Sequence, residues 1–254
     1  GALDEVRPEA LGAVLAVHHR FQHGEHVLRG EVGAVVELDP GAEPKSVGEV
    51  MSIARTFKEA LQKAVRMLNQ EYQGIVDERE MGKSSGELRR RLKEPDVKRL
   101  FVIAAALARG ITVDEIYSLT GIDPWFLYSL ARIVKTYNKL RTCRSLTYEV
   151  LSDAKRQGFS DRQIAHVKKI REIDVRQKRM KEGIIPVVKH IDTMAGEFPA
   201  QTNYLFMTYG GYVSDYVPDS KEDKVIVLGG GPYSIGTSVE FDWCAVNTSI
   251  TLKK

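Results

Sequence analysis

The regular spacing of apolar residues along the chain begins after Pro44. From there, apolar residues recur at steps of three and four, which places them on one face of an α-helix. These residues are Val50, Ile53, Ala54, Phe57, Leu61, Ala64, Val65 and Leu68. Ser46 followed by Glu49 forms a capping box, a sequence found at helix starts. The pattern therefore predicts one amphipathic helix from Ser46 to about Asn69.

Residues 74–86 are polar and interrupted by glycine, which predicts a linker or loop between two folding units. Beyond them lies a series of short helical patterns with recognisable caps. The start signals are Thr112 with Glu115, Asp123 before Pro124, and Ser160 with Gln163, and the stop signals are Gly110, Gly158 and Gly183. The predicted helices span residues 100–109, 112–119, 123–137, 147–157, 160–167 and 173–181.

The pattern changes after Gly183 to runs of β-branched and aromatic residues, of which 187–188 and 203–209 are strand-like. Residues 224–228 form an apolar run before three glycines, which is typical of a buried strand, and residues 240–252 fit a following helix. One strand and one helix cannot make a domain, because the strand lacks a sheet partner. This region therefore predicts the opening of a larger α/β unit.

Residues 1–43 form a separate zone with poor periodicity. The apolar run from Leu11 to Val17 fits either a helix or a strand, and a strong turn signal follows at residues 39–41. This segment stays unassigned.

Composition narrows the class of protein without naming a function. The chain has 254 residues, 43% of them hydrophobic and 28% charged, which predicts a soluble globular protein of one large or two smaller domains. A net charge of +3 does not call for a nucleic-acid or membrane partner. Two cysteines suit a reducing compartment. No apolar run reaches the length of a membrane span, and residues 1–7 do not resemble a signal peptide.

Four histidines raise the question of a metal site. His19, His23 and His26, with His18 adjacent, would share one face of a helix, as zinc or copper ligands can. Gly24 weakens the helix, and no carboxylate or cysteine completes a ligand set. A solvated histidine-rich stretch is the favoured interpretation, and no metal is expected.

Two helix pairs have helix-turn-helix proportions, one around Gly121 and one around the turn at residues 158–160. Basic residues follow the second pair, at Arg171, Arg176, Lys178, Arg179 and Lys181. Trp125 and Phe126 open the helix that would read DNA in the first pair, and bulky apolar residues there indicate packing. A stand-alone helical module with DNA binding of this type remains the alternative function.

The glycine-rich turn from Gly229 to Gly236 follows the predicted strand and offers a third reading, nucleotide binding. Its third glycine is displaced from the dinucleotide fingerprint, and Pro232 removes a backbone donor. A tight strand-to-helix turn is favoured. Cys244, beside Trp243, is predicted to be a buried small residue and not a nucleophile.

Several sequence blocks together resemble one family, the carbamoyl-phosphate synthase large chains. The blocks are KSVGEVM at 45–51, IDPWFL at 122–127, GFSDRQI at 158–164, EFPAQTNY at 197–204, VLGGGP at 227–232 and SVEFDWCA at 238–245. Their order and spacing match from about residue 45 to residue 254. The resemblance implies a mainly α fold, a central helical oligomerization domain flanked by partial α/β segments of ATP-grasp and pre-ATP-grasp type.

The same resemblance implies domain bounds: residues 1–43 divergent, 44–80 ending the first ATP-grasp half, 81–200 the oligomerization domain, and 201–254 opening the second half. Such enzymes make carbamoyl phosphate from bicarbonate, ammonia (usually from glutamine) and two ATP, and carbamate moves through an internal tunnel. They serve pyrimidine or arginine and urea metabolism, in the cytoplasm or, for urea-cycle enzymes, in mitochondria.

By matching motif, Glu49, Ser238 and Glu240 are expected to border that tunnel. No catalytic, cofactor-binding or metal residue is expected in this chain, because the family's ATP-contacting residues lie outside the matching range. ATP with Mg or Mn serves the parent enzyme, and the isolated chain is predicted to be inactive. The expected partners are further copies of the chain, the rest of the synthase and a glutaminase domain or subunit, with no nucleic acid and no membrane.

Overall fold

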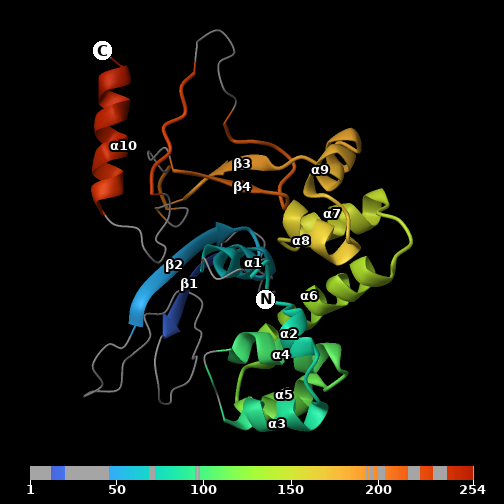
Figure 1. Cartoon of the computed structure of the whole chain (residues 1–254). Coiled ribbons are helices and arrows are strands. Elements are labelled where there is room, and N and C mark those ends of the chain that lie inside the picture. Colours follow the sequence, from blue (N-terminus) through green and yellow to red (C-terminus); the bar gives the residue numbers. More distant parts are fainter. Residues whose placement is uncertain are drawn as a thin grey trace, which may run out of the picture.

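The computed structural model describes residues 13–20, 46–68, 72–94, 96, 98–192, 194, 197–199, 204–216, 224–230 and 239–253. These residues form ten α-helices and four β-strands. Most helices gather into one body, two-stranded sheets lie beside it, and the last helix stands apart (Figure 1). The predicted fold class, mainly α with partial α/β flanks, is confirmed.

The first regular element after Pro44 is a strand where the sequence predicts a helix. Strand β2 (Ser46–Ala54) pairs antiparallel with strand β1 (Ala13–Arg20). Val50, Ser52 and Ala54 are buried and the residues between them are half-buried, an alternation of period two. The helix prediction was wrong for these residues, because a short apolar run fits both periods and pairing with β1 decides between them. β1 also shows that the apolar run within residues 11–17 is a strand from residue 13 on.

Helix α1 (Phe57–Met67) begins after β2, and its start has a local cause. The Thr56 side-chain oxygen accepts a hydrogen bond from the Glu59 backbone N–H at 3.3 Å, which caps the first turn. Leu61 and Val65 of α1 are buried in the main hydrophobic core. The second half of the predicted helix is therefore confirmed.

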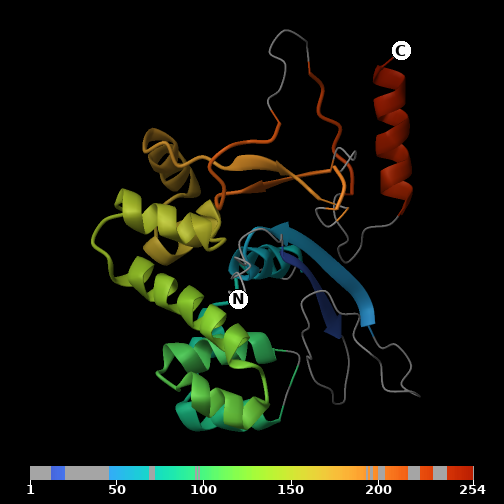
Figure 2. The ribbon, with the colours of Figure 1, turned by 180° about the vertical axis from the view of Figure 1, so that it is seen from behind.

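Helices α2 to α9 form the helical body, which spans residues 78–181. Its elements are α2 (Glu78–Met81), α3 (Ser85–Lys93), α4 (Arg99–Ala108), α5 (Val113–Thr120), α6 (Pro124–Thr142), α7 (Tyr148–Arg156), α8 (Asp161–Lys168) and α9 (Glu172–Lys181). Helix α6 runs from the group α2–α5 to the group α7–α9 (Figures 1 and 2). The predicted linker at residues 74–86 contains α2 and the start of α3, so it is partly helical.

The helix starts in the body follow the predicted caps. The side-chain oxygens of Thr112 and Ser160 accept from the backbone N–H groups of Glu115 and Gln163, at 3.2 and 2.9 Å. Asp123 caps Trp125 in the same way at 2.7 Å. These starts are confirmed, because an N-cap depends on residues within one turn and needs no distant partner.

The region after the helical body contains little regular structure. Strands β3 (Val187–His190) and β4 (Leu205–Thr208) pair antiparallel, as the strand-like runs predicted. Helix α10 (Val239–Leu252) confirms the predicted last helix. Residues 224–228 form no strand, and Leu228 is 90% exposed, because no neighbouring strand pairs with them among the described residues. Cys244 is exposed, so the prediction of a buried cysteine was wrong.

A search of the described helices finds none that is both long enough and apolar enough to cross a membrane.

Candidate functional site

The three predicted tunnel residues come from opposite ends of the described chain. Glu49 lies on β2, where its Cα pairs with that of His18 on β1. Glu240 lies in the first turn of α10, and Ser238 is outside the described residues. Helix α10 stands apart from β2 (Figures 1 and 2). The structure therefore does not bring Glu49 and Glu240 together, and their tunnel role stays a prediction.

A cleft of about 290 Å³ lies where α1, the α7–α8 turn, the start of α9 and β4 meet, and we call it the α1–β4 cleft. Glu59 of α1, only 1% exposed, forms an ion pair with Lys63 at 3.1 Å. Glu59 also accepts a hydrogen bond from the Thr208 hydroxyl at 2.7 Å, and Lys63 donates to the Met207 carbonyl at 2.7 Å. These contacts hold β4 on α1.

A second set of buried charges continues the cleft on the helical body. Lys155, at the end of α7, lies 2.7 Å from Asp161 at the start of α8, and Arg179 of α9 lies 2.8 Å from the same carboxylate. Burial opposes ionisation of Asp161, but hydrogen bonds from Lys155 and Arg179 outweigh it and hold the pKa of Asp161 below its usual value. Both cations also face the Tyr209 ring, at 4.7 and 5.8 Å from its centre.

Sequence reasoning missed this network. Glu59 and Lys63 are spaced four apart, which looks like an ordinary pair on an exposed helix face. Thr208 is 149 residues from Glu59, so no local pattern connects them. The tight turn at Gly158 was the only local signal, and it predicted a helix stop.

Contacts in the first turn of α6 argue against the helix-turn-helix interpretation. The Phe57 ring of α1 lies 5.4 Å from the Trp125 ring and 5.3 Å from the Phe126 ring, measured between centres. The helix start that would enter a DNA groove is thus partly covered by α1, although Trp125 stays 55% exposed. Four of the five basic residues near α9 are engaged as well, since Arg171, Arg176, Lys178 and Arg179 form ion pairs with carboxylates.

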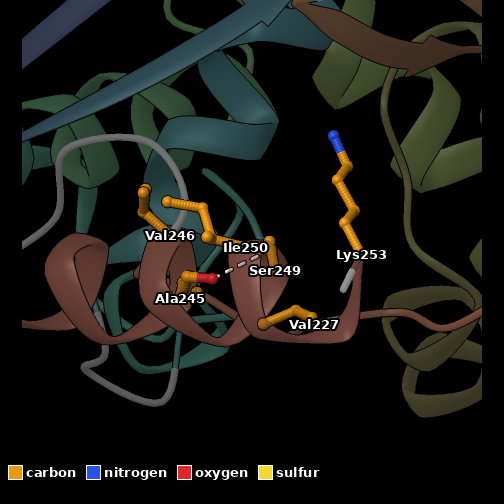
Figure 3. A pocket seen from close by; sticks show the side chains of 7 residues that line it. Val227, Ala245, Val246, Ser249, Ile250 and Lys253 are labelled. Atoms are coloured by element: carbon orange, nitrogen blue, oxygen red, sulfur yellow. Dashed lines mark hydrogen bonds between the residues drawn. The ribbon is translucent and has the colours of Figure 1, made fainter.

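The candidate nucleotide site is only partly described. A pocket of about 350 Å³ lies between residues 227–229 and the face of α10 that carries Ala245, Ser249 and Ile250 (Figure 3). Lys253 is the only charged residue of its lining among the described residues. The rest of the glycine-rich turn, residues 231–236, lies outside the described residues. Small and apolar walls of this kind offer few donors to a phosphate.

The histidine hypothesis also concerns residues that are only partly described. His18 and His19 lie on β1, and His23 and His26 are outside the described residues. Because β1 is a strand, the helical spacing that the hypothesis requires does not apply at His19.

Comparison with known proteins assigns the chain to a family. Residues 49–183 match the family model of the carbamoyl-phosphate synthetase large chain, oligomerisation domain. Residues 221–254 match that of the carbamoyl phosphate synthase preATP-grasp domain. The first match covers more than half of the chain and includes the whole helical body. The chain therefore belongs to the carbamoyl-phosphate synthetase large-chain family, whose oligomerisation domain indicates self-association within the synthase.

Individual relatives agree with the family models. The chain is 45% identical over 219 residues to carbamoyl-phosphate synthase [ammonia], mitochondrial, of Rattus norvegicus, a match that covers 84% of this chain and 14% of the relative. It is 47% identical over 214 residues to multifunctional protein pyr1-3 of Dictyostelium discoideum, covering 82% and 9%. It is 46% identical over 217 residues to multifunctional protein CAD of Squalus acanthias, covering 84% and 9%.

The chain thus spans between 9% and 14% of the length of these relatives. They are a synthase and multifunctional proteins by name, and they lend no support to the DNA-binding alternative.

Proposed function

We propose that this chain is the part of a carbamoyl-phosphate synthase that joins its two synthetase halves and holds copies of the enzyme together. The observation that carries the proposal is the family match over residues 49–183, which coincides with a well-packed helical body. The whole enzyme would make carbamoyl phosphate from bicarbonate, ammonia or glutamine, and two ATP.

The chemistry would belong to other parts of the enzyme. ATP with Mg or Mn would bind outside this chain, and a glutaminase domain or subunit would supply ammonia. Glu49, Ser238 and Glu240 would border the carbamate tunnel in the assembled protein. The location would be cytoplasmic, or mitochondrial for an enzyme of the urea-cycle type, and neither nucleic acid nor a membrane would be a partner.

Exposed aromatic residues on α6 offer a surface for self-association. Trp125 and Tyr128 lie one turn apart, and each is 55% exposed. Aromatic side chains are enriched in protein interfaces, because they bury a large area at low cost in conformational entropy. We therefore place the contact between copies on this face of α6.

Sedimentation velocity over a range of concentrations tests this proposal. The wild-type chain should associate reversibly, and Tyr128→Ser should raise the dissociation constant at least tenfold. Tyr148→Ser on α7, where the side chain is 48% exposed, is the matched control and should leave association unchanged. A chain that stays monomeric at every concentration would contradict the proposal.

An assay of carbamoyl phosphate formation tests whether the catalytic residues lie outside this chain. The isolated chain should form no product from ATP, bicarbonate and ammonia in the presence of Mg. Product above the level of a boiled sample would show that this chain carries catalytic residues and would overturn that part of the proposal.

A further inference from the structure

The α1–β4 cleft contains more positive than negative charge. Its lining includes the basic residues Lys63, Arg66, Lys155 and Arg176 and the acidic residues Glu59, Asp161 and Glu172. Arg179 reaches the same Asp161 carboxylate from behind the lining. Five cationic groups thus share three carboxylates, so the described charged side chains of the cleft carry a net charge of about +2 at neutral pH.

The ion pairs show which residues carry the excess positive charge. Glu59 is paired with Lys63, and Glu172 lies 3.2 Å from Arg176. Asp161 pairs with both Lys155 and Arg179 and also lies 3.8 Å from Arg176. One charge of this shared set is uncompensated, and the other belongs to Arg66, which forms no ion pair with any described carboxylate.

Arg66 is half-buried and uses little of its hydrogen-bonding capacity. Its Nη1 donates to the Gly158 carbonyl at 2.7 Å, whereas a guanidinium carries five N–H donors. Burial lowers the pKa of Arg66 to about 10, and the nearby Glu59 only partly opposes this effect. The charged form has lost hydration, and no carboxylate among the described residues forms an ion pair with the guanidinium to replace it. An anion placed against the guanidinium would restore favourable interactions through charge-assisted hydrogen bonds.

A helix terminus adds to the positive potential of the cleft. Ser160, the N-cap of α8, lines the cleft, so the positive end of the α8 dipole borders it. Arg176 lies at the rim with its side chain 50% exposed and is able to turn toward a ligand. The cleft is therefore bordered by the fixed N-terminus of α8 and by the movable Arg176 side chain, both of which can donate hydrogen bonds.

We propose that the α1–β4 cleft binds a small doubly charged anion, namely inorganic phosphate or the phosphate group of a small metabolite. Arg66 is its main donor and Arg176 its second. Phosphate fits because it carries nearly two negative charges at neutral pH and accepts several hydrogen bonds at once. Binding would join α1, α8 and α9, and so stabilise the packing of the first element after β2 on the helical body.

Isothermal titration calorimetry with inorganic phosphate tests the proposal on the whole 254-residue chain, at an ionic strength held constant with chloride. The wild type should bind one phosphate saturably. Arg66→Gln should weaken binding tenfold or more, because it removes a charged donor. Arg90→Gln, which alters an exposed arginine paired with Glu94 on α3, is the matched control and should bind like the wild type.

Arg176→Gln provides a second variant that does not disturb buried packing, and it should weaken phosphate binding several-fold. If circular dichroism shows that Arg66→Gln alters the fold, the test of the proposal rests on phosphate binding by Arg176→Gln. Absence of saturable phosphate binding by the wild type would overturn the proposal, and so would equal binding by Arg176→Gln and the wild type. The sedimentation experiment on α6 does not depend on phosphate, so the two proposals fail separately.

Discussion

Buried charges at the α1–β4 cleft show how single residues shape the packing. Asp161 and Lys155 are each about 95% buried at the side chain, and each is satisfied by the other. A buried ion pair contributes little net stability, but removal of one partner is costly because the other charge stays unpaired. The network therefore fixes how the α7–α8 turn and β4 meet more than it stabilises the fold.

The pH dependence of stability follows from Asp161. Because its pKa is lowered in the folded chain, the folded state binds this proton less readily than the unfolded state does. The stabilising contribution should be complete above about pH 5 and should be lost as the pH falls below about 4. Urea unfolding between pH 3 and pH 7 measures this loss.

Asp161→Asn should be less stable than the wild type by about 3–5 kcal/mol at pH 7, because Lys155 loses its buried partner. The difference in the free energy of unfolding between this variant and the wild type should decrease below pH 4. Asp174→Asn, at an exposed pair with Arg171, is the control and should change stability little at any pH. A pH-independent difference for Asp161→Asn would contradict the assigned ion pair.

Gly158 lies where the α7–α8 turn closely approaches α1, and substitution of this residue tests that contact. Its φ is +88°, and a Cβ there would lie 2.9 Å from the Glu59 Cα. Gly158→Ala should lower the free energy of unfolding by more than about 2 kcal/mol, the sum of backbone strain and a backbone collision. Gly110→Ala is the matched control, since its φ is +85° but no atom of the described residues lies within 4 Å of the added carbon. Equal losses for the two variants in urea unfolding would show that the turn does not pack against α1.

At the scale of the element, the helices of the body are defined by their starts. The cap of α5 is typical, since the Thr112 hydroxyl accepts from the Glu115 backbone N–H. Strands behave differently, because each needs a partner to satisfy its backbone groups. Residues 46–54 form strand β2 because they pair with β1. Residues 224–228 have no described partner strand, and they do not form a strand.

Thr112→Ala should destabilise the chain by about 1 kcal/mol, because the first turn of α5 loses its side-chain acceptor. Ser118→Ala on the same exposed helix removes a hydroxyl that bonds only to the Glu115 carbonyl, and it should change stability by a few tenths of that value. Thermal unfolding of both variants makes the comparison. A larger loss for Ser118→Ala would contradict the importance of the cap.

At the scale of the whole molecule, a packed helical body contrasts with an exposed C-terminal region. Helix α6 joins two helical groups into one core. Near α10, by contrast, Ile226 is 84% exposed and Trp243 is 69% exposed. Apolar surface of this extent marks a contact site or an aggregation risk. Both residues lie within the range 221–254 that matches the preATP-grasp domain model.

The double substitution Ile226→Lys and Leu228→Lys should raise the solubility of the chain without a change in its melting temperature, since neither side chain belongs to the core. Ile185→Lys, at a residue 63% exposed beside the helical body, is the control and should improve solubility less. Precipitation by ammonium sulfate compares the three chains. A lower melting temperature for the double variant would mean that residues 226–228 contribute to the fold.

The sequence by itself determined the features that depend on neighbours within a few residues. The caps at Thr112, Asp123 and Ser160 and the mainly α fold class were predictable for this reason. The family was predictable too, because several separate blocks matched in order, as the family models confirm.

Only the tertiary structure decided the features that depend on distant partners. Pairing with β1 made residues 46–54 a strand, although their apolar spacing also fits a helix. The hydrogen bond between Thr208 and Glu59 and the packing of the Tyr209 ring on Lys155 close the cleft, and no local pattern shows that such charges are buried. Local hydrogen bonds are encoded in adjacent residues, whereas strand pairing and charge burial are settled only when remote segments meet.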